Sequence, residues 1–372
     1  MSIPFSVQGP DRPELRQAIE EIVASGFLGV QLRVNDERGE WVGGAGARRL
    51  EGDTAPLTDG HFRIGSSTKS FVATTVLMLV AEGRIGLDAP AADHLPGFGL
   101  DRRITVRMLL QHTSGVFNHT GELHEDGTFA PGVPWRGKEW VDNRFRTYLP
   151  DELVRLSLSR PARFAPGTGW SYANTNYVLA RMVVEQVTGV PFAEELRRLV
   201  LEPLGMTGTV APGTSPEVPE PHHHGYYRYE DAGRERTVDV TRHNPSWVSA
   251  GGDMISTTRD LHTYFAALMG GKLLPAALLA EMRTPDPRAG YGLGVFVQDT
   301  GARGGVIYHH NGATIGSAAL MYSSPDGGTT LTAGLNHVDD ADVSIAAAFH
   351  GAQQRLVGAV FGGGHAGPGH EA

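Results

Sequence analysis

The chain has 372 residues, of which 40% are hydrophobic and 20% charged, with a formal net charge of −9 and no cysteine. This composition indicates a soluble globular protein with one large core or two packed lobes, and it excludes disulfides, thiolate catalysis and cysteine-ligated metals. The acidic balance, without any block of lysine or arginine, argues against nucleic acid or an anionic membrane as a partner, so we expect a small-molecule substrate.

The N-terminal stretch "MSIPFSVQGPDRPELRQ" lacks the basic region, apolar region and cleavage site of a secretory signal. As written, the sequence therefore predicts a cytoplasmic protein, or a secreted one if a signal segment has been removed. No apolar run reaches the roughly 20 residues that span a bilayer, so we expect no membrane-spanning segment.

The first predicted element is a helix over residues 11–26, with Asp11 as N-cap, a proline in the first turn and a glycine at the end. Two alternating runs, "GVQLRVND" and "EWVGGAGA", predict antiparallel strands joined by "ERG". Residues 67–83 are too uniformly apolar for a surface helix, which predicts a central buried one.

Residues 84 to about 245 have mostly helical patterns with long loops. Short alternating runs then return, namely "GYGLGVFVQ", "GGVIYHH", "GSAALMYSS" and "TTLTAGLNH", before a last helix over about 339–358. Strands at both ends and helices between them predict an α/β (α+β) fold, in which the first strands pair with the last in an antiparallel sheet flanked by helices. We assign residues 1–85 and 245–360 to this part, 86–244 to a helical lobe and 361–372 to a flexible tail.

A lysine stands three residues after a serine at the start of the central helix, in "GSSTKS". Only three of the 32 basic residues are lysine, and Lys69 is one of them. Arginine cannot release its proton in a protein, whereas a desolvated lysine can. At this spacing Ser66 and Lys69 share a helix face, so a neutral amine could activate the hydroxyl as a nucleophile. The alternative is that Ser66 is an N-cap and Lys69 a solvated residue of the first turn.

Two further stretches could contribute to a site. In "WSYANTNY", Tyr172 and Asn174 precede a predicted helix, although an N-cap and a packed tyrosine would explain them equally. In "YHHNGATIGS", strand alternation places His309 and His310 on opposite faces, and Gly312 would allow a close backbone approach.

Together these stretches resemble the motifs of the penicillin-recognising serine enzymes, specifically the branch of class C β-lactamases and Streptomyces-type D-alanyl-D-alanine carboxypeptidases. Four longer segments also resemble sequences of that branch: "FRIGSSTKSFVA", "LLQHTSGV", "PGTGWSYANTNYVLA" and "SAGGDMISTTRDL". The resemblance covers about residues 12–360. It implies a five-stranded antiparallel sheet with an inserted all-α lobe.

The resemblance also implies roles for the catalytic residues. Ser66 would attack a carbonyl, and Lys69 and Tyr172 would share its proton, either one serving as the base. The phenol of Tyr172 would be kept partly ionised by Lys69 and His310. Asn174 would orient Lys69 or the substrate amide.

The oxyanion hole would be formed by the backbone N–H groups of Ser66 and Ala313. The predicted substrate-binding residues are two from the third motif and three aromatic ones: Asn311, Gly312, Trp247, Phe117 and Phe296. The aromatic-rich stretch 117–148 would either wall the pocket or form a small separate core.

One departure from the family pattern bears on the substrate. Carboxypeptidase members bind a terminal carboxylate with threonines and an arginine, whereas this chain has Asn311, Ala313 and Phe296 at those positions. A buried carboxylate without a cationic partner is costly, so a neutral ester, amide or β-lactam is predicted to fit better than D-alanyl-D-alanine. Three other arginines could bind a substrate carboxylate from another direction: Arg242, Arg288 and Arg303.

We therefore predict a serine acyl-hydrolase that forms an acyl-enzyme on Ser66. The alternatives are a transacylase that passes the acyl group to an amine, a D-alanyl-D-alanine carboxypeptidase and a non-catalytic ligand sensor on the same fold. We expect no cofactor and no metal, because the histidines of "PHHHGYY" and "NHTGELHED" lack a known zinc-ligand spacing.

Overall fold

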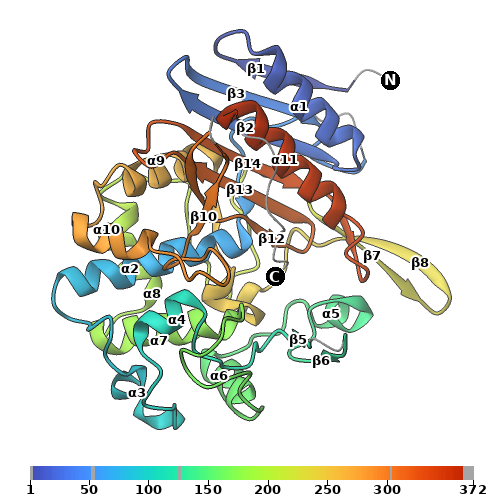
Figure 1. Cartoon of the computed structure of the whole chain (residues 1–372). Coiled ribbons are helices and arrows are strands. Elements are labelled where there is room, and N and C mark those ends of the chain that lie inside the picture. Colours follow the sequence, from blue (N-terminus) through green and yellow to red (C-terminus); the bar gives the residue numbers. More distant parts are fainter. Residues whose placement is uncertain (1–2, 52–54, 125–126, 302–303, 363–372) are drawn as a thin grey trace.

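A computed structural model describes residues 3–51, 55–124, 127–301 and 304–362. Its centre is an antiparallel sheet in which N-terminal and C-terminal strands lie side by side (Figure 1). The strand order is β1 (Phe5–Gln8), β3 (Gly39–Gly46), β2 (Gly29–Asp36), β14 (Thr330–Asn336), β13 (Ser317–Ser323), β11 (Val306–His309) and β10 (Phe296–Asp299), with β12 (Gly312–Thr314) also pairing with β13.

The predicted pairing of the first strands with the last is confirmed by the register of β2 against β14, which joins Val30 to Leu335. The sheet has eight strands rather than five. One extra strand is β1, which covers the outer edge of β3. Others arise because the chain breaks at His310 and Asn311, so that β11 and β12 pair with β13 as two separate short strands.

One face of the sheet is covered by α1 (Pro13–Ala24) and α11 (Ala346–Phe361), which pack against each other (Figure 1). Leu15 and Ile19 of α1 and Leu356 of α11 are fully buried in this core. Arg12 rather than Asp11 precedes α1, and residues 338–340 form a strand instead of the start of the last helix. Residue 361 still belongs to α11 and Gly362 is its C-cap, while residues 363–372 of the predicted tail lie outside the described residues.

The other face carries α9 (Thr258–Met269) and, beyond it, a second and larger core built around α2 (Thr68–Ala81). Buried residues of α2 occur at every position from Thr68 to Leu77, which confirms the prediction of a central helix. The remaining helices are α3 (Ala91–His94), α4 (Val106–Gln111), α5 (Gly137–Asn143), α6 (Pro150–Leu158), α7 (Asn174–Thr188), α8 (Phe192–Leu196) and α10 (Ala276–Arg283).

The segment predicted as a helical lobe also contains strands. The hairpin of β7 (Tyr226–Asp231) and β8 (Arg234–Asp239) projects from the molecule (Figure 1). The strand β15 (Val338–Asp340) pairs with β7 in parallel and completes a three-stranded sheet. A shorter pair in this segment is β5 (Glu122–Leu123) with β6 (Phe129–Ala130). Outside it, β4 (Phe62–Arg63) pairs with β9 (Ile255–Ser256). Five single turns complete the list: η1 (Gly65–Ser67), η2 (Pro96–Phe98), η3 (Arg197–Leu201), η4 (Pro245–Trp247) and η5 (Ser249–Gly251). Among the described helices, none combines the length and apolar character needed to cross a membrane.

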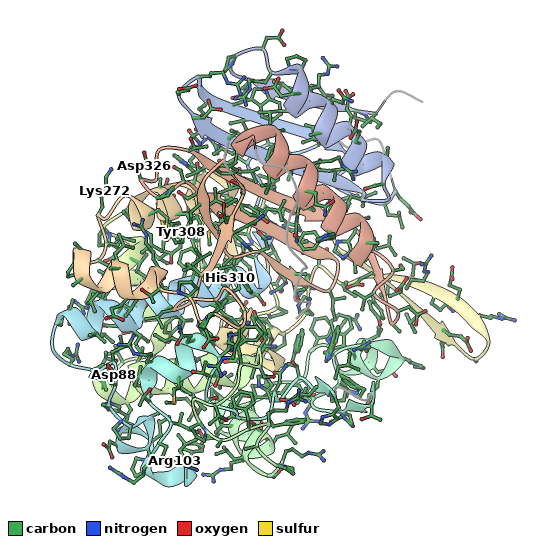
Figure 2. All side chains as sticks on the ribbon, in the orientation of Figure 1. Asp88, Arg103, Lys272, Tyr308, His310 and Asp326 are labelled. Carbon is green, nitrogen blue, oxygen red and sulfur yellow. The ribbon has the colours of Figure 1, made fainter. Side chains whose placement is uncertain are left out.

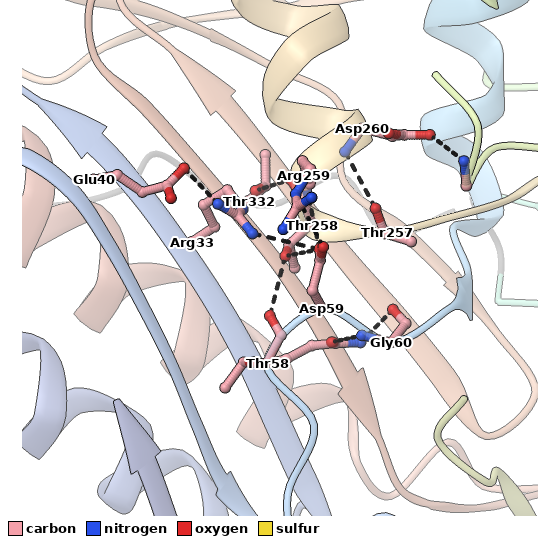
Figure 3. A network of polar contacts seen from close by, with 12 residues as sticks. Arg33, Glu40, Thr58, Asp59, Gly60, Thr257, Thr258, Arg259, Asp260 and Thr332 are labelled. Atoms are coloured by element: carbon pink, nitrogen blue, oxygen red, sulfur yellow. Dashed lines mark hydrogen bonds and ion pairs between the residues drawn. The ribbon is translucent and has the colours of Figure 1, made fainter. Parts of the chain in front are cut away.

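A polar network fixes the loop that leads into the catalytic segment (Figure 3). The carboxylate of Asp59 lies 3.2 Å from the Arg259 guanidinium and 3.5 Å from that of Arg33, and it accepts a hydrogen bond of 3.1 Å from Thr258. Because Arg33 is 3% exposed and also contacts Glu40, its charge is paired on two sides. The network thus ties the start of α9 to strand β2 and to the chain entering β4.

Candidate active site

The nucleophile candidate Ser66 lies in the middle of η1, a single 3₁₀ turn between β4 and α2. It is half-buried, whereas its neighbours Ser67, Thr68 and Lys69 are fully buried. Ser67, not Ser66, stands at the N-cap of α2, and its hydroxyl donates to the carbonyl of His310 at 2.7 Å. The fold therefore exposes the Ser66 hydroxyl and occupies that of its neighbour.

Lys69 is fully buried against this hydroxyl. Its Nζ lies 3.2 Å from Ser66 Oγ, 2.6 Å from Asn174 Oδ1 and 2.7 Å from the Gly251 carbonyl. Burial lowers the pKa of Lys69 well below its ordinary value, so the amine can be neutral. A neutral amine has two N–H bonds for the two carbonyl oxygens, which can only accept. Its lone pair is then left for Ser66, the one partner that has a proton to give.

Asn174 is the first residue of α7 and not its N-cap, a position taken by Ala173. Its Nδ2 donates to Thr120 Oγ1 at 3.1 Å, which fixes the amide so that Oδ1 faces Lys69. A Cβ atom at residue 251 would lie only 2.9 Å from Asn174 Oδ1. Gly251 and Thr120 are thus site residues that our motif reading missed, and the paired glycines of "SAGG" were their only signal in the sequence.

Tyr172 is close to both catalytic groups. The Lys69 ammonium position is 4.5 Å from the centre of the Tyr172 ring. The buried hydroxyl has no hydrogen bond of normal geometry to any described residue. Burial raises the pKa of Tyr172, and the nearby Ser66 hydroxyl offsets only part of this effect. The expectation of a partly ionised phenol is therefore wrong, because a neutral Lys69 supplies no charge that would stabilise the phenolate.

The His310 side chain does not contact Ser66 or Lys69 by a hydrogen bond among the described residues. Its Nδ1 donates to the Asn311 carbonyl at 2.9 Å, and its Nε2 accepts from the Tyr291 hydroxyl at 3.0 Å. Burial lowers the pKa of His310 to about 3, so the ring is neutral and contributes no positive charge. The predicted direct catalytic role is thus not what the contacts show: His310 meets the catalytic turn through its backbone carbonyl, which accepts from Ser67.

The third motif meets the catalytic turn backbone to backbone. A Cβ atom on Gly312 would lie 2.0 Å from the Ile64 carbonyl oxygen and 2.6 Å from the Ser66 nitrogen. A Cβ atom on Gly65, whose φ is +49°, would lie 2.7 Å from the Ala313 nitrogen. Both glycines are needed for this approach.

The register also orients Ala313. Ala313 is paired with Ala318. The next pair, Thr314 with Ser317, flanks the two-residue turn at 315–316. The pair beside such a turn is hydrogen-bonded and the next pair is not, so the N–H of Ala313 points away from β13 and towards the catalytic turn.

We expect Gly312→Ala to be strongly damaging although it adds a single methyl group. The new Cβ would overlap the backbone of Ile64 and Ser66, which cannot move without displacing the nucleophile. A loss of about 1–3 kcal/mol or more in the free energy of unfolding is expected from overpacking, measured by denaturant titration. The matched change Gly328→Ala, whose Cβ would contact only the Asp326 side chain at 3.2 Å or more, should be well tolerated.

Three of the predicted substrate-binding side chains are engaged elsewhere. Asn311 Nδ2 donates to the Tyr322 hydroxyl at 2.6 Å. Phe296 stacks on His309, with ring centres 5.2 Å apart. Phe117 is buried, and its carbonyl accepts from Thr175 Oγ1 at 2.9 Å. The Asn311 and Phe296 side chains thus contact Tyr322 and His309, and Phe117 contacts Thr175 through its backbone carbonyl.

Trp247 lies nearer the reacting groups. It immediately precedes the segment of Gly251 and stacks in parallel on Trp135, with ring centres 6.3 Å apart and an interplanar angle of 5°. Trp135 donates to the carbonyl of Thr120, the residue that orients Asn174. Trp135 also packs against the small core of Trp140 and Tyr227, so the aromatic stretch forms a separate core that extends to the site through Trp135.

The alternative cations considered from the sequence are already paired or not described. Arg242 contacts Glu217 at 2.5 Å and Arg288 contacts Asp286 at 2.6 Å, while Arg303 lies outside the described residues. The rings of His222 and His224 lie 5.0 Å apart, but no group of three metal-binding side chains occurs within the described ranges.

Comparison with known proteins gives a family and several close folds. A family model described as Beta-lactamase matches residues 15–354. A D-stereospecific amidohydrolase from Streptomyces sp. superposes with a TM-score of 0.77 at 38% identity, covering 92% of this chain and 99% of that one. A D-amino acid amidase from Ochrobactrum anthropi SV3, complexed with D-phenylalanine, gives a TM-score of 0.79 at 27% identity, with 93% and 98% covered.

Among curated relatives, esterase EstB from Burkholderia gladioli is 36% identical over 178 residues, which are 45% of this chain and 43% of the esterase. The matched regions span only 54%, 43% and 62% of the first three curated relatives.

Proposed function

Since the chain belongs to the beta-lactamase family, whose members include serine hydrolases, we propose that it is a hydrolase that forms an acyl-enzyme on Ser66 and cleaves small neutral amides or esters. The observation that carries the proposal is the buried amine of Lys69, 3.2 Å from a half-exposed serine hydroxyl and held by two other oxygens that can only accept. A ligand sensor would not require this arrangement.

In the proposed acylation step, neutral Lys69 takes the hydroxyl proton as Ser66 Oγ attacks the substrate carbonyl. The N–H groups of Ser66 and Ala313 would stabilise the oxyanion that develops. The protonated Lys69 keeps its two carbonyl acceptors, and its third proton becomes available to the leaving amine or alcohol, with the neutral Tyr172 hydroxyl beside it as the proton carrier. Attack of water on the ester would then release the acid and restore Ser66.

The charge distribution supports a neutral substrate. Asn311 and Phe296 are tied to Tyr322 and His309, and Arg242 and Arg288 are paired with carboxylates. A substrate carboxylate would therefore lack the charge-assisted hydrogen bonds that repay its desolvation. The amidohydrolase and amidase neighbours, together with the esterase relative, favour amides and esters over a dipeptide acid.

We expect neutral donors to be turned over faster than a substrate with a free terminal carboxylate. A missing charge-assisted bond corresponds to about 1.5–3 kcal/mol, so kcat/KM for an amino-acid amide or a p-nitrophenyl ester should exceed that for D-alanyl-D-alanine by about 10-fold or more. Intact-mass analysis with each donor, and with a chromogenic cephalosporin, would show a covalent adduct on Ser66.

Faster release of D-alanine from the dipeptide would refute this substrate class. Adding an amine during ester turnover tests the transacylase alternative, since trapping of the acyl group at the expense of free acid would identify the amine as the natural acceptor.

A further inference from the structure

His112 occupies an unusual backbone conformation beside the site. It ends α4 with φ +63° and ψ +33°, the left-handed region that residues other than glycine seldom adopt. Its side chain is 1% exposed, and its ring lies against that of Tyr172, with centres 4.3 Å apart and planes tilted by 35°. The reaction steps above do not use this buried histidine.

Three hydrogen bonds join His112 to the segment that carries the second motif. Its carbonyl accepts from the Ser171 nitrogen at 3.1 Å. Its Nδ1 accepts from the Ala173 nitrogen at 3.2 Å and from Asn176 Nδ2 at 3.0 Å. The residues on both sides of Tyr172 are thus held by one histidine.

The same contacts determine the proton position on the ring. Both groups that reach Nδ1 are donors, because the amide of Asn176 is fixed by its Oδ1 accepting from Ser114 at 2.6 Å. Nδ1 must therefore carry a lone pair, and the proton sits on Nε2, which is buried without a partner among the described residues. Burial lowers the pKa of His112 well below its ordinary value and so favours this neutral form.

We infer that His112 is a positioning residue, which holds Tyr172 and Asn174 in register with Lys69 by means of its unprotonated Nδ1. The inference rests on the proposed function, since it assigns His112 to the acylation of Ser66. A shift of the 171–176 segment would move the Asn174 oxygen, which accepts from Lys69 at 2.6 Å, and would free the amine to turn away from the serine.

Three substitutions separate the Nδ1 acceptor from the ring and from the backbone conformation. In His112→Asn the amide oxygen can take the place of Nδ1, and asparagine tolerates left-handed φ. His112→Phe keeps a ring against Tyr172 but cannot accept a hydrogen bond. His112→Gly also lacks the acceptor and relieves any backbone strain, so it remains informative if the phenylalanine variant does not fold.

The acylation rate of Ser66 by a p-nitrophenyl ester, measured per folded active site, should fall about 100-fold in the phenylalanine and glycine variants, the size expected for a small misplacement of catalytic groups. It should stay within about 10-fold of wild type in the asparagine variant. The half-buried His94, changed to phenylalanine, is the matched control and should leave the rate unchanged.

Amide hydrogen exchange gives a readout that does not depend on catalysis. The amide of Ala173, which donates to Nδ1, should lose protection in the phenylalanine and glycine variants and regain it in the asparagine variant, whereas the amide of Ser171, which donates to the backbone carbonyl of residue 112, is the internal reference. Equal rates in all three variants, or equal losses in asparagine and phenylalanine, would overturn the positioning role. If wild type formed no adduct while the exchange pattern appeared as expected, the proposed function would fail, but the role of His112 in holding the 171–176 segment would stand.

Discussion

Ser66→Ala is expected to abolish the covalent adduct and to reduce kcat by about 10⁴–10⁶-fold, the range seen when a serine nucleophile is removed from a hydrolase. The hydroxyl of Ser66 lies 3.2 Å from Lys69 Nζ, and Ser66 is half-exposed within a turn whose neighbouring side chains are buried. Intact-mass analysis after mixing with a p-nitrophenyl ester, together with steady-state turnover, measures both effects.

The neighbouring serine provides a matched control. The Ser67 hydroxyl is fully buried and donates to the His310 carbonyl at 2.7 Å. Ser67→Ala should lower the free energy of unfolding by about 1 kcal/mol through the lost hydrogen bond, while the adduct still forms on Ser66. An adduct that persisted in Ser66→Ala, or one that vanished only in Ser67→Ala, would place the nucleophile elsewhere.

Lys69→Arg should lose activity by about 10³-fold or more although the formal charge is kept. A guanidinium stays protonated, so it cannot accept the Ser66 proton, and its planar fork does not match the three oxygens that surround Nζ. The comparison is kcat/KM for ester hydrolysis in the purified, folded variant.

Lys272→Arg is the control for this exchange, because Lys272 lies on the exposed periphery of the molecule, far from the buried His310 (Figure 2). It should be silent in both activity and stability. Turnover near the wild-type level in Lys69→Arg would mean that Lys69 acts only as a local cation.

The same lysine should reduce stability at neutral pH. Its pKa is lower in the folded chain than in the unfolded one, so between these two values the unfolded state binds more protons and stability rises with pH. Lys69→Met, which removes this titration, should be inactive. The free energy of unfolding of wild type should rise relative to that of the variant from neutral pH towards about pH 10, where the lysine of the unfolded chain also loses its proton. Thermal unfolding at both pH values tests the sign.

Much of the fold could be predicted because its elements have strong local patterns. The uniformly apolar run of α2 demands burial on every side, and the alternation in β2, β3, β13 and β14 predicts half-buried strands that pair between the two ends of the chain. The short strands β10 and β11 fall in the predicted runs "GYGLGVFVQ" and "GGVIYHH", whereas β12 was missed, because it exists only where the chain breaks at His310 and pairs again with β13.

The sequence by itself also predicted the candidate residues of the site. A lysine three residues after a serine, where arginine serves nearly everywhere else, selects a group that can release its proton, and the motifs of Tyr172 and Asn174 indicated its partners. The spacing within one helical turn guaranteed that Ser66 and Lys69 would be close, whatever the rest of the chain did.

Only the tertiary structure decided the protonation states of the site residues and which distant residues contact them. The pKa values of Lys69, Tyr172 and His310 are set by how completely distant segments bury them, and no local pattern encodes that burial. The carbonyl of Gly251 and the ring of His112 reach the site from elements far apart in the sequence. Such contacts follow from how α2, α4, α7 and η5 pack together, since hydrogen bonding and desolvation act through space and not along the chain.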